Sequence, residues 1–250
     1  MTNKKELAGI ASKAREELAG IASKTREELA GIARDLRSYI EAEKAAGTAD
    51  IITPARPRNA ASNSKKSGLL DPVKREVFSC RRCPLYKTKK NYVFSDGDPE
   101  ARLVFVGEAP GGDEDIQGVP FVGRAGQLLT KMIEAMGLRR QDVYICNVIK
   151  CRPPNNRAPL PEEVAACKDY LLRQVGIISP KVICCLGKHA TEALLGTEVF
   201  ITKIRGKEFE FNGVTLIPTY HPAYLLRNPS AKKEVWQDLK KIMKILSEQD

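Results

Sequence analysis

Short apolar runs alternate with amphipathic stretches through the last two-thirds of the chain. Continuous apolar runs predict buried strands at residues 103–106, 143–148, 182–186 and 214–218. Apolar positions at a helical period predict helices at residues 126–136, 161–175, 188–195 and 231–246. Residues 200–204 and 208–211 flank Gly206 and predict a hairpin. The alternation predicts an α/β fold, a three-layer α/β/α sandwich over a central, mainly parallel sheet.

The N-terminal segment has a different period. The repeat ELAGIASKARE at residues 6–16 recurs with changes at 17–27 and 28–38. Eleven residues make about three helical turns, so each copy places its apolar residues on the same stripe. We expect residues 1–46 to form a long amphipathic helix. Its repeated glycines weaken it by about 1 kcal/mol each, so it needs an unknown protein partner, a second copy of itself or a lipid interface. A solvated helical appendage or a weak coiled coil is the plainer reading of the same pattern.

Residues 47–72 are expected to form a flexible linker, because proline, serine and glycine interrupt both periods there. The remaining residues, 73–250, form the predicted α/β domain. No apolar run approaches the roughly 18–20 residues that span a bilayer, and the first residues lack the pattern of a secretory signal. We therefore expect a cytoplasmic protein without a membrane span.

Charge and cysteine content narrow the function. The 250 residues carry a formal net charge of +10, of which +7 lies after residue 72. This surplus makes a polyanion the first partner to consider. Seven cysteines are an odd number, and in a reducing compartment they favour metal ligands or reactive thiols over a disulfide framework.

Four of these cysteines can complete one metal site. Cys80 and Cys83 form a CxxC motif, and Cys151 and Cys167 follow at a distance. Zinc and an iron–sulfur cluster both accept four thiolates. A redox CxxC is the other reading, but it lacks a thioredoxin-like βαβ context. The other three cysteines lie in predicted strands and are expected to be buried hydrophobes: Cys146, Cys184 and Cys185.

Two loops at the ends of predicted strands carry candidate chemistry. GEAPGGDED at residues 107–115 matches no nucleotide-binding pattern; its acidic groups suit a divalent metal or an attacking water, but a plain Gly/Asp loop explains them as well. His221 precedes a proline after the last strand and can donate to an anionic leaving group. His189 opens a helix and is interpreted as structural or incidental.

Four motifs occur in one order: CRRC at 80–83, GEAPGGDED at 107–115, NVIKCRPPNNR at 147–157 and HPAYLL at 221–226. Together with PFVGRAGQLL at 120–129, they resemble the family 4 uracil-DNA glycosylases, the iron–sulfur class of bacteria and archaea. The resemblance covers residues 73–250. It implies a glycosylase fold, excision of uracil from single- or double-stranded DNA in base excision repair, and a [4Fe–4S] cluster on Cys80, Cys83, Cys151 and Cys167.

The resemblance also implies a uracil-binding pocket. The target nucleotide must leave the base stack before its glycosidic bond can be reached. Phe121 is expected to lie under the flipped ring. The amide of Asn147 suits uracil O4 and N3–H and rejects cytosine, whose donor and acceptor there are reversed. His221 is expected to donate to uracil O2 as negative charge develops on the base.

The sugar side of the reaction is assigned to the acidic loop. Glu108 and Glu114 are expected to stabilise the oxocarbenium-like sugar or to orient the water, with Asn156 holding that water or Glu108. Ala109 and Gly111 complete the predicted substrate-binding loop. Several other glycosylase families carry an Asp or Asn where this chain has Ala109, which cannot bind a water.

Two further readings are weighed against this one. A uracil-DNA binding protein on the same scaffold would lack turnover, but the related covalent binders carry an inserted basic loop with a reactive histidine that is absent here. A non-enzymatic iron–sulfur or zinc regulator would only bind DNA. No lysine occupies a position suited to Schiff-base chemistry, so we expect an abasic product without strand cleavage. Basic residues near the predicted cluster are expected to contact phosphates: Arg81, Arg82, Lys87, Lys89, Lys90, Arg152 and Arg157.

Overall fold

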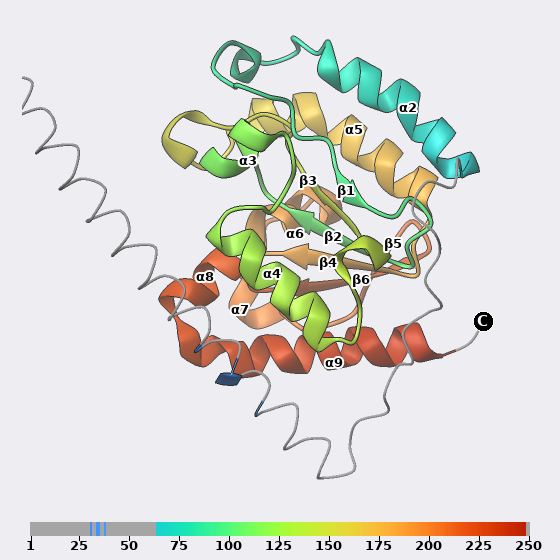
Figure 1. Ribbon diagram of the computed structural model, residues 1–250, viewed down its shortest axis with the longest axis vertical. Helices are drawn as coiled ribbons and strands as arrows, with labels where there is room; N and C mark the ends of the chain where they lie inside the picture. The colour runs from blue at the N-terminus through green and yellow to red at the C-terminus, as the bar shows by residue number, and fades with distance from the viewer. Residues whose placement is uncertain (1–30, 32–33, 36–37, 39–63, 249–250) are drawn as a thin grey trace, which may run out of the picture. The chain divides into compact units, whose positions relative to one another are not determined.

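The computed structural model (Figure 1) describes residues 31, 34, 35, 38 and 64–248. The chain divides into two units, Met1–Ile51 and Ile52–Asp250. In the first unit the four described residues are helical, as the predicted repeat helix requires. The rest of that helix, and residues 47–63 of the predicted linker, lie outside the described residues.

A six-stranded sheet forms the centre of the second unit, with strand order β1-β3-β2-β4-β6-β5. The four inner strands run parallel: β3 (Tyr144–Asn147), β2 (Leu103–Gly107), β4 (Val182–Leu186) and β6 (Val214–Thr219). The short edge strands β1 (Asp96–Gly97) and β5 (Phe209–Phe211) pair antiparallel to their neighbours. All residues of β2, β3 and β4 are buried, which is why they appear in the sequence as continuous apolar runs.

Helices cover both faces of this sheet (Figure 1). On one face, Val104 and Val106 join a core with α5 (Pro161–Ile178) and α6 (Lys188–Leu195), and α2 (Lys65–Phe78) packs on α5. The other face is covered by α4 (Arg124–Ala135) and α9 (Lys232–Ser247), the latter in contact with β4 and β6. The predicted three-layer sandwich is confirmed. None of the helices in the described ranges is long and apolar enough to span a membrane.

Shorter elements complete the unit, and most of them lie in connecting loops. They are α3 (Gly112–Gln117), α7 (Ile201–Ile204), α8 (Pro222–Arg227) and the 3₁₀ turns Pro84–Lys87, Arg140–Asp142, Pro154–Asn156 and Pro229–Ala231.

The predicted hairpin around Gly206 is wrong. Residues 201–204 form α7, and β5 pairs instead with β6. The turn between these two strands is Asn212-Gly213, with φ of 50° and 79°. Two successive positive φ angles are what a tight two-residue hairpin turn requires, and Asn-Gly is the pair that adopts them most readily.

The predicted linker also ends too late, because residues 65–72 form the first half of α2. The Ser64 side chain caps this helix by accepting from the Ser67 N–H. Leu70, Val73 and Val77 are buried in the same core as α5. This burial outweighs the helix-breaking composition, so the folded domain starts before residue 73.

Candidate active site and thiolate cluster

The ends of β2 and β3 bring two predicted uracil-binding residues together. Gly107 and Asn147 are register partners at the carboxyl ends of these strands. A Cβ atom on Gly107 would lie 2.3 Å from Asn147 Oδ1 and 2.4 Å from Phe121 Cζ, so only glycine fits there. Asn147 is 1% exposed, and its Oδ1 has no hydrogen-bond partner among the described residues. A buried acceptor of this kind leaves a place for a donor from a ligand.

Phe121 is held in a conformation that non-glycine residues rarely adopt. Its φ is 53°, in the left-handed region. The Arg140 guanidinium donates to the carbonyls of Phe121 (3.0 Å) and Pro120 (2.6 Å) and to the Asp96 carboxylate (2.7 Å). A Cβ on Gly126 would come within 1.9 Å of the Phe121 carbonyl. Arg140 and Gly126 were not predicted: Arg140 lies outside the quoted motifs, and Gly126, within PFVGRAGQLL, has no side chain that suggests a role.

His221 approaches Phe121 from the end of β6. Its ring centroid lies 5.6 Å from that of Phe121, with 33° between the planes. Its Nδ1 accepts from the Ala223 N–H at 3.1 Å, which caps α8. Burial lowers the pKa of His221 to about 4, against the opposing charge of Glu108. The imidazole is therefore neutral near pH 7, with its proton on Nε2.

Glu108 directly follows Gly107 and makes an ion pair that the sequence did not reveal. Its Oε2 lies 2.8 Å from His189 Nδ1. This hydrogen bond raises the pKa of His189, while burial opposes the shift. His189, interpreted from the sequence as structural or incidental, thus lies at the site. The available signal was its position three residues beyond the carboxyl end of β4.

Glu114 links two loops of the site. Its Oε1 accepts from the N–H groups of Val122 and Gly123, both at 2.9 Å, and its Oε2 accepts from the Gly111 N–H at 3.1 Å. Both carboxylate oxygens are thus engaged by backbone donors that fix the loop after Phe121. The direct catalytic part expected of Glu114 stays a prediction.

Asn156 and Ala109 occupy more peripheral positions than the pocket residues. Asn156 is exposed, and its Oδ1 accepts from Arg152 Nε at 2.7 Å. In residues 64–248 no hydrogen bond joins Asn156 to Glu108, so its predicted role is untested. Ala109 is half-buried and packs against the core.

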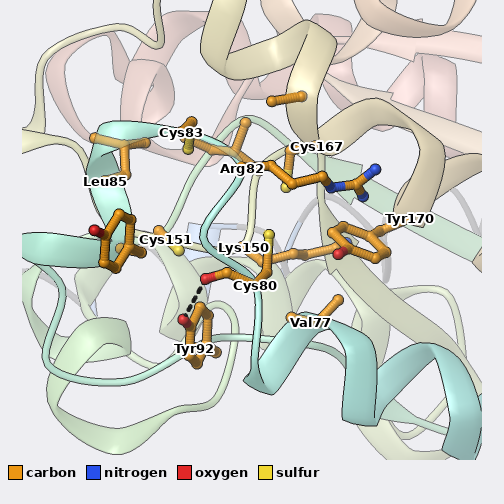
Figure 2. Close-up of a pocket in the computed structure, with 13 residues that line it drawn as sticks. Val77, Cys80, Arg82, Cys83, Leu85, Tyr92, Lys150, Cys151, Cys167 and Tyr170 are labelled. Carbon is orange, nitrogen blue, oxygen red and sulfur yellow. Dashed lines mark hydrogen bonds between the residues drawn. The ribbon is translucent and has the colours of Figure 1, made fainter.

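The four predicted metal ligands line a single hollow. Cys80 and Cys83 flank the turn after α2, Cys151 follows β3, and Cys167 belongs to α5. Figure 2 shows their sulfurs directed into this hollow, with Tyr92 donating to the Cys80 carbonyl at 2.6 Å. The other three cysteines are fully buried in β3 and β4, as predicted.

Burial and neighbouring groups set the pKa values of these four thiols. Burial, together with the charges of the neighbouring cysteines, raises the pKa of Cys151. Burial likewise raises the pKa of Cys83 and of Cys167. At Cys80 burial acts in the same sense, but hydrogen bonds from Tyr170 and Arg82 prevail and lower its pKa. A cation in the hollow would favour the thiolate form of all four.

Several of the basic residues near this hollow have partners within the protein. Arg82 lies over the Tyr170 ring, 4.0 Å from its centroid, and Arg157 pairs with Glu163 at 2.6 Å. Lys89 lies 3.7 Å from the centroid of the Tyr92 ring. These contacts hold the cations around the cysteine hollow, with Arg82 and Arg157 still partly exposed.

Several known proteins are similar to this chain in sequence. A profile of the uracil DNA glycosylase superfamily matches residues 94–240. The type-4 uracil-DNA glycosylase of Archaeoglobus fulgidus is 51% identical over 181 residues, which cover 69% of this chain and 91% of that protein. That of Thermotoga maritima is 50% identical over 177 residues, 69% of this chain and 92% of that protein. A type-5 uracil-DNA glycosylase of Thermus thermophilus is 36% identical over 114 residues, 40% of this chain and 52% of that protein.

The chain therefore belongs to the uracil DNA glycosylase superfamily and, within it, to the type-4 uracil-DNA glycosylases, as its motifs predicted.

Proposed function

We propose that this chain excises uracil from DNA by hydrolysing its N-glycosidic bond, and that it leaves an abasic site for base excision repair. The observation that carries this proposal is the buried Oδ1 of Asn147, which has no hydrogen-bond partner among the described residues and lies near the Phe121 ring, itself 5.6 Å from the His221 ring. An acceptor, an aromatic face and a neutral imidazole are the three groups that binding and expelling a flipped uracil requires.

The pocket recognises uracil through the Asn147 amide. Its Oδ1 accepts the N3–H of the base, and its Nδ2 donates to O4. Cytosine presents an acceptor and a donor at these positions, so it would leave two buried polar pairs mismatched. The Phe121 ring supplies the stacking surface that a base loses when it leaves the duplex.

Bond cleavage separates charge, and the site has a group on each side of that separation. The electron pair of the glycosidic bond moves onto uracil, where Nε2–H of neutral His221 donates to O2. Positive charge develops on the sugar, where the carboxylate of Glu108 stabilises it. A water then adds to the anomeric carbon of the sugar, and its proton passes to the uracil anion, directly or through solvent, so that neutral uracil leaves.

A uracil-containing oligonucleotide tests the function directly. The full chain is expected to release uracil and leave a strand that breaks only on alkali treatment. Asn147→Asp is expected to lower uracil release at least about 100-fold, because its carboxylate faces O4 without a donor. Its ratio of cytosine to uracil release should rise, since Asp accepts from N4–H. Tight binding of uracil DNA by wild type without release would favour a binding protein and contradict the proposal.

Arg140 is expected to strengthen the binding of uracil DNA by holding Phe121 in position. Arg140→Ala removes charged donors to two carbonyls, each worth about 1.5–3 kcal/mol, and should raise KM for uracil DNA by about 10-fold or more with a smaller change in kcat. Arg139→Ala is the matched control, because this adjacent, exposed arginine bonds Asp142. Equal KM values for the two variants in a steady-state assay would contradict this role.

We also propose that Cys80, Cys83, Cys151 and Cys167 hold a [4Fe–4S] cluster. Nowhere in the described ranges do three His, Cys, Asp or Glu side chains converge closely enough to share one metal ion. One zinc ion would draw four sulfurs to within about 4 Å of each other, since Zn–S is about 2.3 Å. A [4Fe–4S] cluster binds each sulfur through a different iron, so its four ligands can lie farther apart than those of one zinc ion. When bound, it supplies positive charge for the four thiolates and ties α2 and α5 to the loop after β3.

The partner of this domain is DNA that contains uracil, and its +7 charge favours phosphate contact. Part of the basic set around the cysteine hollow remains exposed, including Arg81 and Lys87. These residues are placed to position the backbone of the DNA, while Asn147 reads the base.

A further inference from the structure

We propose that His189 is a positioning residue of the active site, which holds the carboxylate of Glu108 in the orientation that uracil excision requires. This inference rests on the proposed function and deepens it. It assigns a role to a residue outside the four motifs, in the helix that follows β4, the strand between β2 and β6.

The fold delivers His189 to this place. β2, β4 and β6 are adjacent and parallel, so their carboxyl ends lie side by side. Gly187, with φ of 92°, follows β4 and leads directly into α6, which places His189 in the first turn of that helix. A Cβ on Gly187 would lie 3.1 Å from the Cβ of His221. His189, His221 and Glu108 therefore occupy three neighbouring strand ends.

The contact between His189 and Glu108 leaves half of the carboxylate available. His189 Nδ1 binds Oε2 at 2.8 Å, and no other hydrogen bond to the Glu108 side chain is seen among the described residues. Glu108 is 30% exposed, and a glutamate side chain there has several rotamers of similar energy. One charge-assisted hydrogen bond selects among them and directs Oε1 away from His189.

The charges around His189 favour its protonated form. Its hydrogen bond with Glu108 raises the pKa of the imidazole, and Glu192 of the same helix acts in the same sense, against burial and Lys188. Lys188 itself pairs with Glu192 and Glu198. The nearby cation Lys188 thus has partners of its own, and His189 is the side chain that bonds Glu108.

Glu108 acts on charge that develops only in the transition state, so the loss of its orientation affects kcat more than KM. His189→Ala in the full chain is expected to lower kcat for uracil release about 10- to 30-fold, with KM changed less than threefold. His189→Asn places an amide N–H where Nδ1–H was, and should keep kcat within about threefold of wild type. Lys188→Ala, the matched control, should keep kcat within about twofold.

A double-mutant cycle separates this role from a structural one. In a Glu108→Gln background, His189→Ala should lower kcat less than twofold further, since the carboxylate it positions is gone. Full additivity of the two losses, or equal kcat for His189→Ala and wild type, would overturn the inference. Absence of uracil release by wild type would instead overturn the proposed function, so the two failures are distinguishable.

Discussion

Replacing His221 with alanine is expected to lower kcat for uracil release by about 100- to 1000-fold, the usual cost of removing one donor to a developing anion. The Nδ1 atom caps α8 and is committed to the Ala223 N–H, so only Nε2–H is left for the leaving group. Single-turnover release of uracil from the full chain measures this effect without interference from product dissociation. Equal single-turnover rates for His221→Ala and wild type would remove His221 from the mechanism.

The form of His221 can be tested through pH. Its pKa of about 4 lies below the ordinary value, so the neutral form persists as pH falls and is lost only near pH 4. The single-turnover rate plotted against pH should therefore show no inflection from His221 between about pH 5 and 8. His221→Gln keeps an N–H near the Nε2 position and should recover part of the rate. An inflection near pH 6.5 that disappears in His221→Gln would contradict a neutral donor.

Cys151→Ala is expected to have the largest effect on stability. It removes one ligand of the proposed cluster and leaves three buried or half-buried thiols without compensation. Structural metal sites contribute about 10 kcal/mol or more to folding, and even about 4 kcal/mol would lower the Tm of a domain of this size by about 10 °C. We expect loss of bound iron and sulfide, loss of visible absorption, and a fall in Tm of at least about 10 °C.

Cys185→Ala is the matched control for the cluster. It is fully buried in β4 and belongs to the same core, but its sulfur lies outside the cysteine hollow. Its loss should cost about 1 kcal/mol and leave iron and sulfide content unchanged. A colourless anaerobic preparation with one zinc per chain would contradict the cluster, as would full iron content in Cys151→Ala.

The inner strands could be predicted from the sequence because they are buried on both faces and read as unbroken apolar runs. The first half of α2 could not, because the burial of Leu70 and Val73 against α5 is a tertiary effect that overrides local composition. The motifs predicted the approach of Phe121, Asn147 and His221. They did not predict the contacts of His189 with Glu108 or of Arg140 with Phe121, which join positions 81 and 19 residues apart.

The carboxylate of Glu114 has a consequence for how a damaged base is found. It fastens the loop of Gly111 to the loop that follows Phe121, and Arg140 fastens that second loop from the other side. The conformational entropy of the pocket is thus lost when the chain folds, before any DNA arrives. The free energy released when uracil enters is then available to offset the unstacking of the nucleotide. A base that fits poorly releases less binding free energy and returns to the DNA base stack. The rigidity of the site therefore contributes to the discrimination between uracil and other bases.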